Sequence, residues 1–230
     1  MYSLSIILPF IDEINSLKKT INIINKQNKE NKEFLIIISS KKTPTKIIKK
    51  LNKHIKKNNI KIFYQKEPFV GGAIKKGIKV SKKSHIVIMA SDLETNPKNL
   101  KKMINVSKKN PKRIICASRW HKDGKINNYG FTKKIFNFLF QIFSKLVLKS
   151  ALSDFTFAYR IYPSNALKKS KFYENKHSFA LEMIIKPIKK GYKTLNVPAT
   201  WSPRTEGISQ NSIFKGFPIK NAISIFFANP

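Results

Sequence analysis

Residues 86–97 have the sequence IVIMASDLETNP, and this stretch decides the predicted fold. Its first four residues form an apolar run that is typical of a β-strand buried on both faces. Asp92 and Glu94 follow just beyond the predicted carboxyl end of that strand. In an open α/β sheet, ligands bind in the crevice beyond the carboxyl ends of the strands. Two carboxylates there could hold a divalent cation and, through it, a diphosphate. The alternative is that they only cap and flank the following helix.

Short apolar runs alternate with amphipathic helical patterns over most of the chain. Strands are predicted at residues 3–8, 34–38, 60–64, 86–89, 114–117 and 194–198. Helices are predicted between them at residues 14–27, 43–58, 71–80 and 99–108. This alternation at short spacing predicts an α/β fold with a mostly parallel sheet and helices on both faces.

The chain carries 46 Lys and Arg residues against 12 Asp and Glu residues, a formal net charge of +34. Such a charge favours an anionic partner, either nucleic acid or an anionic membrane surface. Nearly all of it is lysine spread over every predicted helix, without a recognition-helix or base-stacking pattern. We therefore expect no specific nucleic-acid partner and rank a basic nucleic-acid-binding protein last among the possible functions.

Cys116 is the only cysteine, which excludes an intrachain disulfide and indicates a reducing compartment. No apolar run approaches the ~20 residues that a membrane span needs. The first residues also lack the basic leader of a signal peptide. Together these features predict a cytoplasmic protein.

Residues 129–152 form a predicted helix that is apolar almost all the way round. Four lysines interrupt it, at positions 133, 134, 145 and 149. The segment is too short and too charged to span a bilayer, but it suits a helix that lies in the membrane interface. A core helix or a dimer-interface helix is the alternative.

Six short motifs occur in one order between residues 5 and 209. They are SIILPFIDE (5–13), VGGAIKKGIKVS (70–81), MASDLETNP (89–97), ASRW (117–120), LSDFTFAYRIYP (152–163) and FALEMIIKPIKKGYKTLNVPATWSPRTEGIS (179–209). In this order they resemble the family 2 glycosyltransferases of the GT-A fold. The likeness is strongest to the dolichol-phosphate mannosyltransferase and polyprenyl-phosphate glycosyltransferase branch.

The resemblance implies a Rossmann-like nucleotide-diphospho-sugar transferase domain over residues 1–212. Residues 1–120 would bind the nucleotide sugar. Residues 121–212, including the interfacial helix at 129–152, would bind the acceptor. Residues 213–230 would form an apolar, basic tail.

The resemblance also implies the donor site. Asp92 and Glu94 would bind a divalent metal ion, Mg²⁺ or Mn²⁺, and this ion would hold the diphosphate. Arg204 would close on the diphosphate. The positions that match the nucleotide-sugar site are Pro9, Ile11, Glu13, Ser39, Ala90, Ser91, Asp92, Arg204 and Gln210.

By the same resemblance, Asp92, Asp154 and Arg204 are the catalytic residues, and Arg119 and Arg160 face the acceptor phosphate. The implied reaction is an inverting in-line displacement from a nucleotide sugar to a polyprenyl phosphate at the inner face of the membrane. A saccharide acceptor, as in cell-envelope polysaccharide synthesis, is the alternative. A saccharide hydroxyl would need a general base, and Asp154 is the candidate, unless it only forms an ion pair that orients Arg160.

The sequence departs from the family at four places in the donor site. Ser39-Ser40 replaces paired aspartates, and Ala90 replaces the first aspartate of the family's DxD motif. Ile11 stands where a tyrosine is expected, and Gln210 where a lysine is expected. These differences leave the base of the donor open, and a variant donor or an impaired enzyme remains an alternative.

Overall fold

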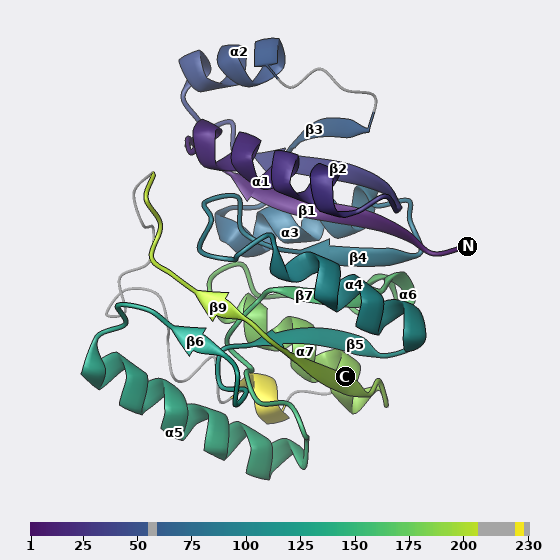
Figure 1. Ribbon diagram of the computed structural model, residues 1–230, viewed down its shortest axis with the longest axis vertical. Helices are drawn as coiled ribbons and strands as arrows, with labels where there is room; N and C mark the ends of the chain where they lie inside the picture. The colour runs from purple at the N-terminus through teal and green to yellow at the C-terminus, as the bar shows by residue number, and fades with distance from the viewer. Residues whose placement is uncertain (55–58, 207–223, 228–230) are drawn as a thin grey trace.

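The six predicted apolar runs and one further strand form a single seven-stranded sheet (Figure 1). The computed structural model describes residues 1–54, 59–206 and 224–227. The strands are β1 (Ser3–Phe10), β2 (Asn31–Ile38), β3 (Ile60–Tyr64), β4 (His85–Ile88), β5 (Ile114–Ser118), β7 (Arg160–Pro163) and β8 (Thr194–Pro198). Their order is β3-β2-β1-β4-β7-β5-β8, and β7 runs antiparallel to both of its neighbours. The predicted α/β fold with a mostly parallel sheet is confirmed.

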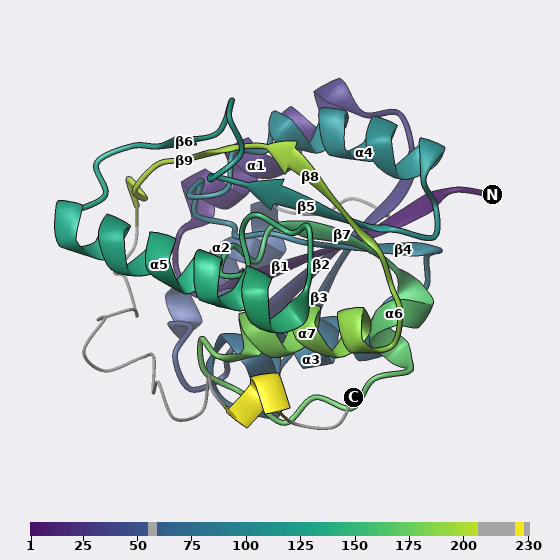
Figure 2. The same ribbon diagram turned by 90° about the horizontal axis from the view of Figure 1, so that it is seen from below.

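Helices cover both faces of the sheet (Figure 2). They are α1 (Ile14–Gln27), α2 (Thr45–His54), α3 (Phe69–Val80), α4 (Asn99–Lys109), α6 (Ser164–Lys168) and α7 (Phe179–Lys189). Residues of α1, α2 and α4 pack in one hydrophobic cluster, whereas those of α3, α6 and α7 pack in another. Because successive strand side chains point to opposite faces, Ile6 belongs to the first cluster and Ile7 to the second. Both faces are therefore buried, as the uninterrupted apolar strands predict.

The register brings the predicted site segments to one edge of the sheet. Strands β1 to β4 are parallel to one another, with Ile7 opposite Ile88, so the segments that follow them emerge at the same edge. The inserted strand β7 places Arg160 between Ile88 of β4 and Cys116 of β5. The chain before β7 therefore meets the carboxyl end of β5.

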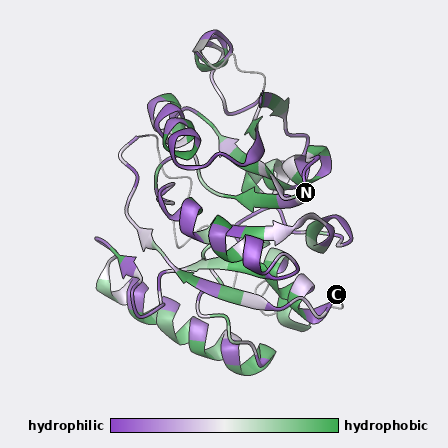
Figure 3. Ribbon diagram, turned by 45° about the vertical axis from the view of Figure 1, so that its right-hand side comes forward, coloured by the Kyte–Doolittle hydropathy of each residue, from purple (hydrophilic) through white to green (hydrophobic). Residues whose placement is uncertain are grey.

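Helix α5 (Phe131–Leu148) packs on the body of the protein through polar residues and through the partly buried side chains of Phe140 and Leu148. Its two fully buried side chains are Gln141 and Ser144, and Asn137 lies on the same face. Nine large apolar side chains of the helix are exposed, with Phe131 at 78% and Leu146 at 73%. Figure 3 shows that hydrophobic and hydrophilic residues alternate along this helix, which lies at the outside of the molecule. An ordinary surface helix shows the opposite arrangement. The alternative that α5 is a core helix is therefore wrong.

Two strands outside the main sheet were not predicted. β6 (Lys125–Ile126) and β9 (Thr200–Trp201) pair in parallel. Thr95 also forms an isolated bridge with Trp201, which places the chain after β9 beside the loop after β4. Of the predicted tail, residues 224–227 are described, and Ile225 and Phe226 are buried in the cluster that contains α3 and α7. Among the described residues, no helix is both long enough and apolar enough to cross a membrane.

The packing of α3 on β1 gives a direct test of the fold. A Cβ atom added at Gly77 would lie 2.6 Å from Cγ2 of Ile7. We expect Gly77→Ala to lower the free energy of unfolding by about 1–3 kcal/mol, as overpacking does, in a denaturant titration. Gly130→Ala is the control, because its nearest neighbour would lie 4.0 Å away. Equal stability of the two variants would contradict this packing.

Candidate active site at the carboxyl edge of the sheet

A guanidinium group bridges the two carboxylates that follow β4. Nη2 of Arg204 lies 2.9 Å from Oδ2 of Asp92, and Nε of Arg204 lies 2.9 Å from Oε1 of Glu94. The bridge between Thr95 and Trp201 holds the two segments together nearby. The structure thus brings together three residues that the sequence predicted for the donor site, although Arg204 lies 110 positions after Glu94.

The loop from Ala90 to Thr95 has a fixed shape that presents Asp92. Thr95 Oγ1 accepts a hydrogen bond from the Ala90 amide and donates one to the Ala90 carbonyl. The amide of Glu94 donates to Oδ1 of Asp92 at 3.0 Å, and Leu93 between them has a left-handed φ of 67°. These contacts hold both carboxylates in place before any ligand arrives.

The pKa of Asp92 is raised from its ordinary value of 3.8 to about 6, chiefly because the carboxyl group is buried. The nearby Glu94 carboxylate contributes to this rise, whereas Arg204 opposes it. Asp92 is therefore mostly ionised at pH 7, although burial makes its ionised form less stable than that of an exposed aspartate. The positive charge of Arg204 beside it stabilises the ionised form.

The two carboxylates suit a divalent ion by their chemistry. Hard cations such as Mg²⁺ and Mn²⁺ prefer carboxylate oxygens, and Mg²⁺ is commonly held by one or two carboxylates together with phosphate and water. The bridging guanidinium indicates that a positive charge is stable between these oxygens. Among the described residues, no group of three or more His, Cys, Asp and Glu side chains could hold a metal ion. The remaining ligands would have to come from substrate and water.

Glu13 and Ser91 brace the end of β1 against the loop after β4. The Ser91 hydroxyl lies within hydrogen-bond distance of a Glu13 carboxylate oxygen and of the Pro9 carbonyl. The other Glu13 oxygen accepts a hydrogen bond from the amide of Asp12 at 3.0 Å. Pro9, Glu13 and Ser91, all predicted for the nucleotide-sugar site, are therefore close together. Because Glu13 is only 8% exposed, they mainly contact one another.

The other described residues predicted for the nucleotide-sugar site also follow strands at this edge of the sheet. Ile11 follows β1, and Ser39 follows β2, where its carbonyl accepts hydrogen bonds from the amides of Lys42 and Thr43. Ala90 follows β4, and Ser40 is exposed. Gln210 lies outside the described residues.

Arg119 and Asp154 form a buried, two-pronged ion pair beside this edge. Nε of Arg119 lies 2.8 Å from one Asp154 oxygen, and Nη2 lies 3.0 Å from the other. The Asp154 carboxylate also accepts hydrogen bonds from the Arg119 and Phe157 amides and from the Thr156 hydroxyl. With five donors and no exposed surface, it is a brace for Arg119 and is poorly suited to act as a general base. The predicted catalytic role of Asp154 therefore finds no support here, and its predicted ion pair forms with Arg119 rather than with Arg160.

Arg160 does not reach the site surface. Its side chain is fully buried, and its guanidinium donates to the carbonyls of Phe155 and Ala180 at 2.7 and 2.9 Å. The prediction that Arg160 faces the acceptor phosphate is therefore wrong, because a side chain without exposed surface cannot contact a ligand. Arg119 keeps 8% exposure and is the better candidate.

Glu182 also has a structural role. It pairs with Lys186 at 2.8 Å and accepts hydrogen bonds from the amides of Tyr173 and Glu174. It therefore anchors the loop before α7.

Glu206 belongs to the site but was not predicted. One of its oxygens accepts a hydrogen bond from the Ser16 amide at 2.7 Å, and the other accepts one from the Asn15 amide at 3.3 Å. It therefore caps the amino end of α1, whose first turn has no acid of its own. This contact holds the chain two residues beyond Arg204. The sequence feature that could have indicated Glu206 is its position two residues after Arg204, in a chain with only 12 acidic residues.

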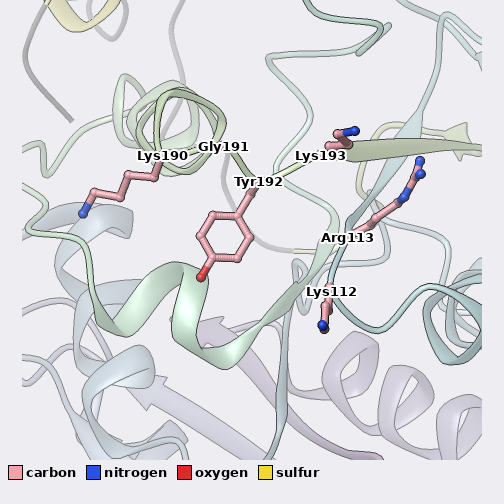
Figure 4. Close-up of a pocket in the computed structure, with 6 residues that line it drawn as sticks. All are labelled: Lys112, Arg113, Lys190, Gly191, Tyr192 and Lys193. Atoms are coloured by element: carbon pink, nitrogen blue, oxygen red, sulfur yellow. The ribbon is translucent and has the colours of Figure 1, made fainter.

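A hollow at the opposite edge of the sheet is not part of this site. It is lined by Lys112, Arg113, Lys190, Gly191, Tyr192 and Lys193, where β5 and β8 begin. Figure 4 shows the charged ends of Lys190 and Arg113 extending in opposite directions. No carboxylate lines it, and the side chains do not converge on one point, so we assign it no function.

The chain belongs to a known enzyme family. Residues 5–170, more than half of the sequence, match the profile of the family described as glycosyl transferase family 2. The protein is therefore a family 2 glycosyltransferase, and the GT-A fold predicted from the sequence is confirmed.

Solved structures of similar fold share little sequence with it. Glucosyl-3-phosphoglycerate synthase from Mycobacterium tuberculosis, in complex with Mn²⁺, UDP-glucose and phosphoglyceric acid, has a TM-score of 0.69 at 10% identity, covering all of this chain and 81% of that one. The same enzyme with Mg²⁺ and UDP has a TM-score of 0.68 at 10% identity, covering 90% and 73%. TarS residues 1–349 from S. aureus give 0.60 at 14% identity, covering 86% and 58%. The ions in the first enzyme agree with the predicted divalent metal.

The raised pKa of Asp92 predicts opposite effects of one substitution on stability and on ligand binding. An acid whose folded pKa is raised loses stability as pH rises from its ordinary pKa through the folded one. We therefore expect Asp92→Asn to match the wild type near pH 3.5 and to be more stable above pH 6. The difference should reach about 2–3 kcal/mol, since one pKa unit corresponds to about 1.4 kcal/mol.

The same variant should lose metal-dependent nucleotide binding at pH 7. Denaturant titrations at several pH values and calorimetry with UDP or GDP and Mn²⁺ measure the two effects. Asp123→Asn, at an exposed aspartate, is the control for both. A variant that is less stable than the wild type at pH 7 would contradict the assignment of Asp92.

Proposed function

We propose that this glycosyltransferase moves a sugar from a nucleoside diphosphate sugar to a polyprenyl phosphate at the inner, cytoplasmic face of a membrane, with inversion at the anomeric carbon. The observation that carries the proposal is the reversed polarity of α5. Its buried side chains are the polar Gln141 and Ser144, Phe140 and Leu148 are only partly buried beside them, and nine large apolar side chains are exposed. Phenylalanine and leucine side chains of this kind are typical of helices that lie in a membrane interface.

Helix α5 is attached directly to the proposed acceptor site. Nη2 of Arg119 donates to Oγ1 of Thr156 at 2.8 Å, and the same oxygen accepts hydrogen bonds from the Asn137 and Gln141 amides of α5. The Phe155 amide also donates to Gln141 at 2.7 Å. A lipid phosphate could thus meet Arg119 while its chain stays near the apolar side of α5.

The charge of the protein supports membrane attachment. Lys133, Lys134, Lys145 and Lys149 accompany the apolar residues in and just after α5, and the whole chain has a net charge of +34. Each basic residue near an anionic membrane contributes about 1 kcal/mol of attraction. The lysines would lie at the headgroups and the phenylalanines at the acyl boundary.

The chemistry of the site also favours a phosphate acceptor. A phosphate oxygen is already ionised, whereas a sugar hydroxyl needs a general base. The carboxylate predicted for that task, Asp154, already accepts five hydrogen bonds. Arg119, held by Asp154, would orient the acceptor phosphate for in-line attack.

On the donor side, Asp92 and Glu94 would hold Mg²⁺ or Mn²⁺. When bound, the ion neutralises charge on the departing nucleoside diphosphate. Arg204 lies where it could turn from the carboxylates to the diphosphate and stabilise the charge that develops there. Ser91 and Glu13 would keep the loop that carries Asp92 fixed against β1.

The test is a transfer assay with radiolabelled UDP- and GDP-sugars, Mg²⁺ or Mn²⁺, and anionic vesicles that contain polyprenyl phosphate. We expect a lipid-linked sugar phosphate, and a product formed at least tenfold more slowly by the double variant Phe136→Glu/Leu146→Glu, which should also sediment less with vesicles. Tyr64→Glu, at an exposed aromatic residue outside α5, is the matched control.

Transfer to a soluble saccharide without transfer to the lipid would replace this proposal with the saccharide acceptor. If α5 is instead a dimer interface, the double variant would be monomeric where the wild type is dimeric, and vesicle binding would be unchanged. Sedimentation equilibrium of both proteins distinguishes these outcomes.

A further inference from the structure

Phe69 holds an aromatic ring in solvent on a strained backbone. It is the first residue of α3, its φ is 61°, and its side chain is 46% exposed. A non-glycine residue in the left-handed region is disfavoured, and such strain is concentrated at functional sites. Because the ring is exposed, burial of apolar surface does not explain why phenylalanine occupies this position.

The surrounding chain enforces this conformation. The Gln65 side-chain amide donates to the carbonyls of Glu67 and Phe69 at 2.7 and 3.1 Å. Gly72 lies so close that an added Cβ atom would be 2.1 Å from the Glu67 carbonyl oxygen. The amide of Gly71 donates to the Asn175 carbonyl at 2.8 Å. Hydrogen bonds within the turn between β3 and α3, and from this turn to Asn175, therefore hold the backbone that carries the ring of Phe69.

Two lysines from different loops flank the ring. Nζ of Lys42, in the loop after β2, lies 5.6 Å from the ring centroid, and Nζ of Lys176, in the loop before α7, lies at the same distance. Cations at this distance from an aromatic face interact favourably with it. In the cluster of this ring and the two lysines, both ammonium groups can only donate hydrogen bonds, and the nearby carbonyls of Glu67 and Phe69 already accept hydrogen bonds from Gln65.

The cluster lies at the same edge of the sheet as Asp92. Phe69 follows β3 and Asp92 follows β4, and the strand order β3-β2-β1-β4 separates them by three strand spacings. At ~4.8 Å per spacing this is roughly 14 Å. An extended nucleoside diphosphate could place its diphosphate at Asp92 and its base toward Phe69. The nearer edge positions, Ile11 and Ser39, offer neither an aromatic ring nor a charge.

We propose that Phe69, Lys42 and Lys176 form the base-binding platform of the donor site, an inference that rests on the proposed function. Every nucleobase has a π-face that can stack on an aromatic side chain. Lysine only donates hydrogen bonds, so the flanking groups favour a base that presents carbonyl oxygens. Uracil and guanine present them, whereas adenine presents an amino group at the corresponding position. The platform thus selects UDP- or GDP-sugars over ADP-sugars.

Phe69→Gly tests the platform, because stability and binding should change in opposite directions. Glycine adopts a positive φ without strain, so the melting temperature should stay the same or rise. The dissociation constants of UDP and GDP with Mn²⁺, measured by calorimetry, should rise by about tenfold, which corresponds to 1.4 kcal/mol of lost stacking. Pyrophosphate with Mn²⁺ has no base and should bind both proteins equally.

Companion variants test the individual groups. Phe69→Tyr keeps the ring and should bind like the wild type. Lys42→Ala and Lys176→Ala should reduce the preference for UDP or GDP over ADP, whereas Lys46→Ala, at an exposed lysine of α2, should not.

Each outcome decides the inference. Unchanged nucleotide binding by Phe69→Gly would overturn the platform while leaving the proposed function intact, and so would an equal loss of pyrophosphate binding. A lowered melting temperature with unchanged selectivity would assign Phe69 a structural role. Failure of every nucleoside diphosphate to bind the wild type would overturn the proposed function itself.

Discussion

The interaction on which the site depends is the bridge from Arg204 to Asp92 and Glu94. Two carboxylates two residues apart repel each other, and the burial of Asp92 raises the cost of its charge. A positive charge between them lowers that cost, and the guanidinium provides it at 2.9 Å from each. This bridge also ties the chain after β9 to the loop after β4. Asp92 and Glu94 would hold a metal ion in place of the guanidinium, and Arg204 could then turn toward the diphosphate, so donor binding and the arrangement of this segment would be coupled.

A second constraint connects the acceptor side to the surface. Buried charges are stable only when they are paired and hydrogen-bonded, and Arg119 and Asp154 meet both conditions. Thr156 extends this polar unit to Asn137 and Gln141 of α5. Because α5 turns Asn137 and Gln141 inward to complete the network, with Phe140 and Leu148 partly buried beside them, most of its large apolar side chains are left exposed. The exposed phenylalanines are thus a consequence of how the helix is attached, and the proposed membrane surface would bury them.

The sequence predicted most of the fold because the strands are uninterrupted apolar runs bounded by polar segments. It also placed Asp92, Glu94 and Arg204 in one site, which the structure brings together. It did not predict β7, which begins with an arginine and ends with a proline and so is not an apolar run. It also did not predict β6 and β9, which depend on pairing across 75 positions. The roles predicted for Arg160 and Asp154 differ from those in the structure because the sequence gives the residue type but not the burial of the side chain. Phe69 was not predicted as a site residue, because a positive φ is usually indicated in a sequence by glycine and here the position is occupied by phenylalanine.

The most direct test of the central claim is the Mn²⁺ affinity of Arg204→Ala, measured at pH 8 by electron paramagnetic resonance with and without a nucleoside diphosphate. If Arg204 occupies the cation position, its removal should tighten the binding of Mn²⁺ alone, because an internal competitor is lost. The same variant should bind Mn²⁺ together with UDP or GDP more weakly, because the diphosphate loses its arginine. Weaker or unchanged binding of Mn²⁺ alone would contradict the account, since Asp92 and Glu94 would then not form the metal site.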